Sequence, residues 1–202
     1  NSAYVPASLR PSGARYVRNV FGERAISLGW SAKPGESEDT RLLRQSLVPF
    51  VASVGEEQPL IQEAGALARQ WLKDRRAVHP DMVSSVLDVA AEFGNQNLFE
   101  SFLTAVRKEP ESRGREQLFR ALSAFRDPAI VRQSLALLLT GEFDAREYFI
   151  LLYGPLAYPE TRDLTFDFVR KNIDRILAHL PREVGEDFAA NLPGAGGAFC
   201  DV

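Results

Sequence analysis

The stretch R-D-L-T-F-D-F-V-R-K-N-I-D-R-I-L, from Arg162 to Leu177, carries apolar residues at the spacing of an α-helix. Wound at roughly 100° per residue, it places them on two arcs instead of one stripe. Leu164 and Phe168 lie on nearly the opposite side of the helix from a larger arc. A helix with two apolar sides packs against neighbours on both, so the stretch predicts a layered helical protein. In the larger arc, which also holds Ile176, we expect burial of Phe166, Val169, Ile173 and Leu177.

The rest of the chain repeats the helical period. Apolar residues recur three and four positions apart in nearly every long segment, and almost none shows the alternation typical of β-strands. Glycine, proline and polar runs separate these segments. The pattern predicts an all-α chain with helices near residues 8–23, 37–54, 57–75, 80–93, 96–107, 112–125, 128–139, 144–153, 161–179 and 182–191.

The spacing of these helices indicates a repeat array. Taken as hairpins, the middle helices recur at a step of about 30 to 45 residues, in the range of armadillo and HEAT repeats. Similarity between the units is weak, so helix spacing carries the prediction. We expect residues 1–202 to form a single helical-repeat domain, a right-handed α-superhelix of antiparallel helix pairs.

The composition is that of an ordinary globular chain and speaks against several classes of partner. The 202 residues are 45% hydrophobic and 25% charged, with a net charge of −3. Arginines are interspersed with Asp and Glu, so no basic stripe indicates nucleic-acid binding. No stretch reaches the ~18 apolar residues that a membrane-spanning helix needs. The single cysteine, Cys200, cannot form an internal disulfide.

The sequence offers few groups for catalysis. An H-E-x-x-H zinc site needs two histidines one helical turn apart and a carboxylate base, whereas His79 and His179 lie far apart. We interpret His79 as a helix-start residue before Pro80, and His179 as a surface residue in the last turn of a helix. The glycine-rich run at 193–199 has no strand before it and no Lys-Ser/Thr after it, so it indicates a loop. We interpret Cys200 as a half-buried thiol.

Carboxylates gather at the expected helix starts. Glu36, Glu38 and Asp39 precede or open one helix, and Glu56 and Glu57 precede the next. At these positions carboxylates offset the unpaired N–H groups of the first turn. We therefore expect no catalytic residue and no metal site in this chain.

Several landmarks follow one another in a recognisable order. They are Leu28-Gly29-Trp30 followed by Glu36, R-L-L-R at 41–44, Trp71, H-P-D-M-V at 79–83, Phe99 to Phe102, R-E-Q-L-F-R-A-L-S-A-F-R-D-P at 115–128 and Y-P-E-T-R-D-L-T-F-D-F-V-R-K-N at 158–172. Their order and spacing resemble the C-terminal helical domain of the aminopeptidase N family, which includes the endoplasmic reticulum aminopeptidases. The resemblance covers the chain from about residue 9 onward.

The resemblance implies a noncatalytic part of a zinc aminopeptidase that removes N-terminal residues from peptides. In that family the catalytic domain carries an H-E-x-x-H…E zinc site and a G-x-M-E-N motif that holds the free amine of the substrate, and this chain has neither. The C-terminal domain is an armadillo- or HEAT-like superhelix that caps the catalytic domain. The implied partners are therefore the catalytic domain of the same polypeptide and a peptide in the concave cavity, with zinc as a cofactor of the parent only.

The segment from 157 to 173 departs from the family pattern R-N-P-x-G-x-x-L-A-W-x-F-L-x-x-N-W. Pro159, Leu164, Phe168 and Asn172 are kept, whereas replacements stand at Ala157, Tyr158, Thr161, Phe166 and Ile173. In endoplasmic reticulum members the arginine at the position of Ala157 lies in the cavity near the C-terminal region of the peptide. Arg126 and Arg162 are nearby cationic candidates for substrate binding. The alternative role of each is plain solvation or a carboxylate pair.

Two expectations concern the chain as a whole. An independent helical-repeat scaffold that binds a protein or peptide in its groove is the alternative to a lid. The family domain begins before this N-terminus and continues beyond 199–200, so we expect an excised fragment of a larger domain. Its first helix then presents Tyr16, Val20 and Phe21 partly toward an absent neighbour, and a second copy is expected to cover them.

Overall fold

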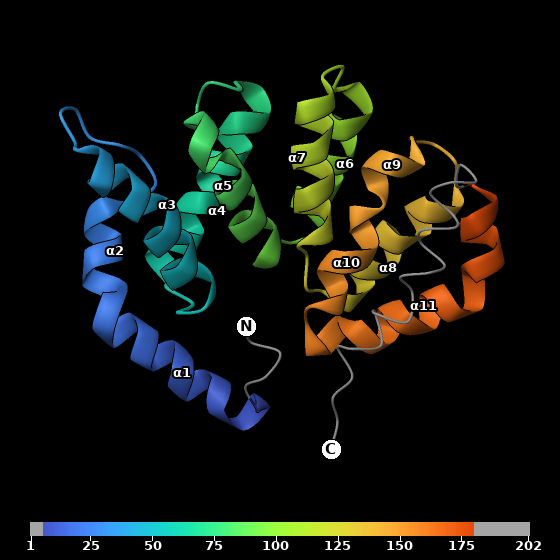
Figure 1. Cartoon of the computed structure of the whole chain (residues 1–202), viewed down its shortest axis with the longest axis horizontal. Helices are drawn as coiled ribbons and strands as arrows, with labels where there is room; N and C mark the ends of the chain where they lie inside the picture. Colours follow the sequence, from blue (N-terminus) through green and yellow to red (C-terminus); the bar gives the residue numbers. More distant parts are fainter. Residues whose placement is uncertain (1–5, 180–202) are drawn as a thin grey trace. The chain divides into compact units, whose positions relative to one another are not determined.

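The computed structural model describes residues 6–179, and every regular element in that range is helical (Figure 1). The all-α prediction is therefore confirmed. The described helices divide into two compact units, one up to Ala105 and one from Val106 onward. The helix α6, Gln96–Lys108, runs across this boundary. The handedness of a superhelix and the single-domain assignment both stay predictions.

The first unit is built from the first helical segment and three long helices. The elements are η2 Ala7–Leu9, α1 Arg10–Val17, the π-helical turn η3 Arg18–Gly22, α2 Glu23–Leu28, α3 Glu38–Ser53, α4 Gln58–Lys73 and α5 Pro80–Glu92. α4 packs along α5, and α3 packs on both. Their amphipathic faces meet in a core that includes Val48, Val51, Leu60, Trp71, Val86 and Leu87. Trp30 anchors the chain to this core, because its indole Nε1 donates to the carbonyl of Leu60 at 2.9 Å.

The first helical segment runs longer than the sequence pattern predicts. We expected it to end near residue 23, but the chain stays helical to Leu28 and ends at Gly29, whose φ is 61°. Gly22 is buried in the π-helical turn, where an added Cβ would lie 3.3 Å from Glu57 Oε2. Gly22 therefore allows a close contact, whereas the left-handed conformation that stops the helix falls on Gly29.

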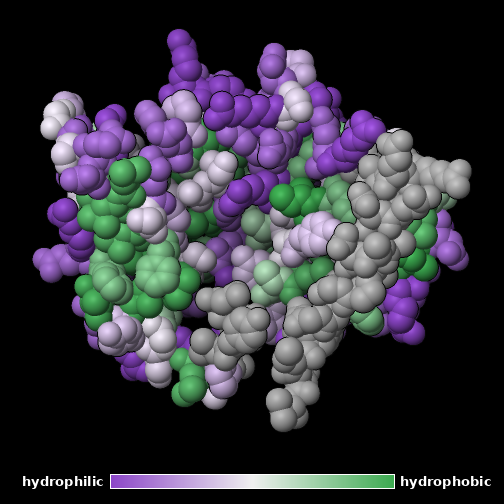
Figure 2. All heavy atoms as spheres, in the orientation of Figure 1, coloured by the Kyte–Doolittle hydropathy of each residue, from purple (hydrophilic) through white to green (hydrophobic). Residues whose placement is uncertain are grey.

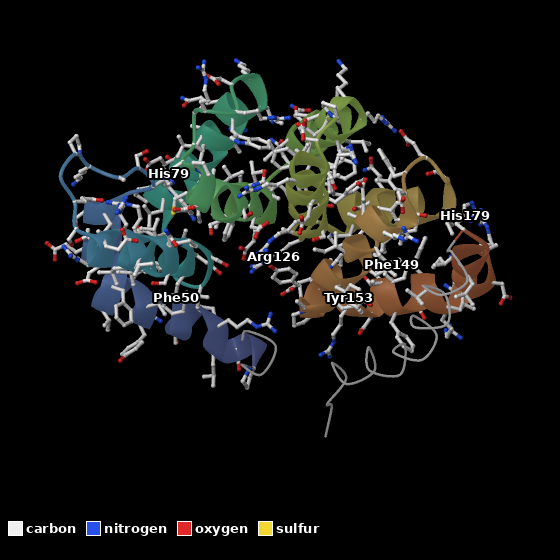
Figure 3. All side chains as sticks on the ribbon, turned by 45° about the horizontal axis from the view of Figure 1, so that its top comes forward. Phe50, His79, Arg126, Phe149, Tyr153 and His179 are labelled. Atoms are coloured by element: carbon white, nitrogen blue, oxygen red, sulfur yellow. The ribbon has the colours of Figure 1, made fainter. Side chains whose placement is uncertain are left out.

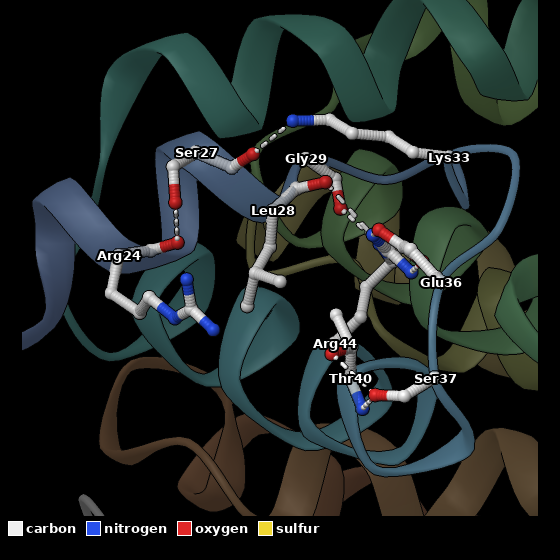
Figure 4. A network of polar contacts seen from close by, with 9 residues as sticks. All are labelled: Arg24, Ser27, Leu28, Gly29, Lys33, Glu36, Ser37, Thr40 and Arg44. Carbon is white, nitrogen blue, oxygen red and sulfur yellow. Dashed lines mark hydrogen bonds and ion pairs between the residues drawn. The ribbon is translucent and has the colours of Figure 1, made fainter.

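A buried ion pair ties α2 to α3 (Figure 4). Arg44, with 2% of its side chain exposed, forms a bidentate pair with Glu36, and its Nη1 lies 2.6 Å from Oε2. Arg44 Nε also donates to the carbonyls of Leu28, at 3.3 Å, and Gly29, at 3.1 Å. The hydrogen bond from Arg44 holds the pKa of Glu36 below its usual range.

The predicted helix-start role of Glu36 is wrong, because its carboxylate faces Arg44. The N-cap of α3 is Ser37, whose Oγ accepts from the amide of Thr40 at 3.3 Å. Glu38 and Asp39 do lie in the first turn of α3, as expected. Glu57 is the N-cap residue of α4 but its side chain forms no capping hydrogen bond.

The second unit consists of shorter helices around an aromatic core. Its elements after α6 are α7 Ser112–Ser123, α8 Pro128–Ala136, η4 Leu137–Leu139, α9 Ala145–Tyr148, α10 Ile150–Leu156 and α11 Pro159–Ala178. α10 packs on α7, α8 and α11. Phe119 makes an edge contact with Phe143 at 5.0 Å between ring centroids. The predicted single helix at 144–153 is instead two short helices that meet at Phe149 and extend to Leu156.

α11 contains the Arg162–Leu177 stretch, and its buried arc is not the predicted one. Val169 and Ile176 are buried, but Phe166 is 39% exposed, and Ile173 and Leu177 are only half-buried. The side chains buried deepest on this helix are those of two threonines, Thr161 and Thr165.

Hydrogen bonds explain why threonines can occupy the inner side of α11. Thr161 Oγ1 donates to the carbonyl of Pro155 at 2.7 Å, and Thr165 Oγ1 donates to the carbonyl of Thr161 at 2.8 Å. Their hydroxyls are therefore satisfied, and their small side chains allow α11 to lie close to α8 and α10. The two apolar arcs flank this line of contact, so a helix that is apolar on two sides packs along the strip between them.

Candidate functional site

Arg126 lies in the short connection between α7 and α8 (Figure 3). Its guanidinium stacks on the ring of Tyr158. The guanidinium carbon is 4.2 Å from the ring centroid of Tyr158, the geometry of a cation–π contact. Both side chains are half-buried. Asp127 holds the connection in place, because its Oδ1 accepts from the amide of Ala129 at 2.7 Å and caps α8.

Arg162, the second predicted candidate, lies in the first turns of α11. Its side chain is 17% exposed, and its Nε lies 3.5 Å from Oδ1 of Asp163, a side chain that is 77% exposed. A carboxylate pair was the predicted alternative to substrate binding, and this contact is such a pair. The Nε atoms of both Arg126 and Arg162 are buried.

Tyr158 connects the two arginines within the second unit. It is the N-cap residue of α11, its ring carries Arg126, and its carbonyl accepts from the amide of Arg162 at 2.9 Å. The start of α11 therefore combines two guanidinium groups with the partial positive charge of a helix N-terminus. Arginine and a helix N-terminus both favour carboxylates, so this arrangement suits an anionic group. Substrate binding by Arg126 and Arg162 stays a prediction.

Three of the replaced family positions, Ala157, Tyr158 and Thr161, lie at the start of α11. Ala157, at the position of the family's arginine, is exposed at the end of α10. Its neighbour Tyr158 supplies the surface on which Arg126 stacks. Arg126 was predicted from the sequence but the role of Tyr158 was not, because the two residues are 32 positions apart and no local pattern joins them. The sequence signal that could have indicated this role is that Tyr158 is an aromatic residue directly before Pro159, at a helix start.

The two histidines have the structural positions that the sequence predicts. His79 is the N-cap of α5, where its Nδ1 accepts from the amide of Asp81 at 3.4 Å. His179 is exposed at the C-terminal end of α11, where its Nδ1 lies 2.8 Å from the carbonyl oxygen of Arg175. Among residues 6–179, no three His, Cys, Asp or Glu side chains are grouped so as to hold a metal ion.

Some predicted features lie outside the described residues. These are the helix at 182–191, the glycine-rich run at 193–199 and Cys200. Within the described part, no helix is both long and apolar enough to cross a membrane.

Two ion pairs support the frame of the second unit. Arg115 on α7 forms a bidentate pair with Glu147 on α9, with N–O distances of 2.7 and 2.8 Å. Arg107, near the end of α6, pairs with Glu142 at 2.6 Å between Nε and Oε1. The hydrogen bond to Arg107 lowers the pKa of Glu142, and the hydrogen bond to Glu147 raises the pKa of Arg115. Both pairs join a helix to a neighbouring segment, so their role is structural.

Comparison with known proteins agrees with the resemblance found in the sequence. The model of the ERAP1-like C-terminal domain family matches residues 1–201. Aminopeptidase 2 of Candida albicans is 22% identical over 167 residues, covering 82% of this chain and 18% of its own length. Aminopeptidase M1-C of Oryza sativa subsp. japonica is 27% identical over 157 residues, covering 75% of this chain and 18% of its own length.

A third relative, aminopeptidase M1-B of Oryza sativa subsp. japonica, is 26% identical over 168 residues and is covered over 19% of its length. The chain thus spans about a fifth of the length of the curated relatives it matches. A family match over nearly all residues, together with the all-helical fold, identifies the chain as a member of the ERAP1-like C-terminal domain family.

Proposed function

We propose that this chain is the noncatalytic lid of a zinc aminopeptidase, which covers the substrate cavity and helps to select the peptides that enter. The observation that carries the proposal is the family match over residues 1–201, joined to relatives named aminopeptidases that are about five times longer than the matched part. The catalytic domain would belong to the same polypeptide. A peptide that loses N-terminal residues would be its substrate.

The start of α11 gives this chain a means to interact with a peptide. Arg126, held on Tyr158, and Arg162 offer guanidinium groups to a carboxylate, such as the C-terminus of a peptide or an acidic side chain. Each contact would be weak, since exposed ion pairs contribute about 0 to 1 kcal/mol. The lid would therefore bias peptide choice through shape and charge, and the chemistry would take place in the catalytic domain.

Activity and metal content of the purified 202-residue chain test the noncatalytic assignment. We expect no stoichiometric zinc by metal analysis and no release of p-nitroaniline from aminoacyl-p-nitroanilides. Zinc polarises the scissile carbonyl and activates water in such peptidases, and it needs about three protein ligands with one open position. One zinc per chain together with chelator-sensitive hydrolysis would overturn the proposal and indicate an independent enzyme.

The reading frame upstream of the chain distinguishes a lid from an independent scaffold. A lid requires G-x-M-E-N and H-E-x-x-H motifs in the same polypeptide. If they are present, Arg126→Ala and Arg162→Ala in the full-length protein should change KM for peptides more than KM for aminoacyl-p-nitroanilides, which do not reach the lid. Tyr153→Ala, at an exposed position of α10, is the control. Absence of the motifs would favour a scaffold that binds a protein or peptide.

A further inference from the structure

We draw no further inference here: the strongest candidate, the apolar patch of Tyr16, Val20 and Phe21 on the first helical segment, whose predicted exposure is confirmed, together with Phe50 of α3 (Figure 2), carries no proposal, because nothing in the structure shows what covers it.

Discussion

α10 in the second unit and α1 in the first unit show two extremes of helix packing. α10 lies among α7, α8 and α11, and the inner side of Gly154 faces the backbone of Ser123. α1 has one buried side, with Ala14 and Val17, and Gly13, beside it, is exposed with no atom within 4 Å of an added Cβ. Both helices contain a glycine, but only at Gly154 would a larger residue clash with its surroundings. The comparison shows that the effect of substituting a glycine depends on how closely other segments surround it. The residue type alone does not indicate that effect.

The largest effect is expected for Gly154→Ala. An added Cβ would lie 2.8 Å from both the carbonyl carbon and the Cβ of Ser123, and closer still to its carbonyl oxygen. Since a backbone group cannot swing aside, α7 and α10 must separate. Overpacking of this kind costs about 3 kcal/mol, which urea denaturation followed by circular dichroism measures. A loss smaller than about 0.5 kcal/mol would mean that α7 and α10 can move apart at Gly154 with little cost.

The next largest effect is expected for Arg44→Leu. This change keeps an apolar stem but removes the donors that reach the carbonyls of Leu28 and Gly29, and it leaves Glu36 without its arginine. Buried acceptors left without a donor cost about 1 to 3 kcal/mol. The same denaturation experiment measures the loss. Arg41→Leu is the control, because Arg41 lies in the same helix with a side chain that is 49% exposed and should change stability little. Equal losses for the two variants would contradict the assigned role of Arg44.

The sequence predicted the helices well wherever local rules decide. α3 to α7 begin and end within two residues of the expected ranges, because prolines, turn residues and helical periodicity act over short distances. It failed at Gly22 and Gly29, which are alike in the sequence. Gly22 is buried within the helix close to the side chain of Glu57, whereas Gly29 takes the positive φ that ends it, and no local pattern distinguishes the two.

α11 shows the same limit in a different form. Periodicity located the helix, but hydrophobicity alone assigned burial to Phe166 when Thr161 and Thr165 occupy the closest contact. Those threonines can be buried because their hydroxyls bond to backbone carbonyls, which hydropathy does not encode. At the candidate site, the sequence supplied Arg126 but not its stacking on Tyr158, because a contact between distant positions depends on how α8 and α11 pack.

Gly13→Ala tests the open side of the comparison and should stabilise the protein. Gly13 is in the helix α1 with room for a Cβ, so alanine lowers the conformational entropy of the unfolded chain without a clash. We expect a gain of about 0.5 to 1 kcal/mol in the free energy of unfolding. Thermal denaturation followed by circular dichroism measures it. A loss of stability would show that this side of α1 is enclosed.

The smallest effect is expected at the exposed pair of Arg107 and Glu142, which sharpens the contrast with Arg44. Their side chains are 47% and 34% exposed, so solvent screens the pair and Glu142→Gln should cost only about 0.5 kcal/mol. The pKa of Glu142 is lowered in the folded protein, mainly by its hydrogen bond with Arg107. A depressed pKa means that the folded state binds the proton less readily than the unfolded state. The contribution is therefore complete above the unfolded pKa near 4.5 and disappears as the pH falls through the lower folded value.

Unfolding free energies of wild type and Glu142→Gln should accordingly differ at neutral pH and converge in strong acid. Glu38→Gln is the matched control: its carboxylate is 64% exposed and paired with Arg41 on the same helix, so the difference from wild type should stay smaller. The loss of unfolding free energy caused by Glu142→Gln could instead be as large as that caused by Arg44→Leu, or could increase as the pH falls. Either result would show that the loop carrying Glu142 shields the Arg107–Glu142 pair from solvent. The rule that enclosure sets the energetic weight of a contact would then fail in the second unit.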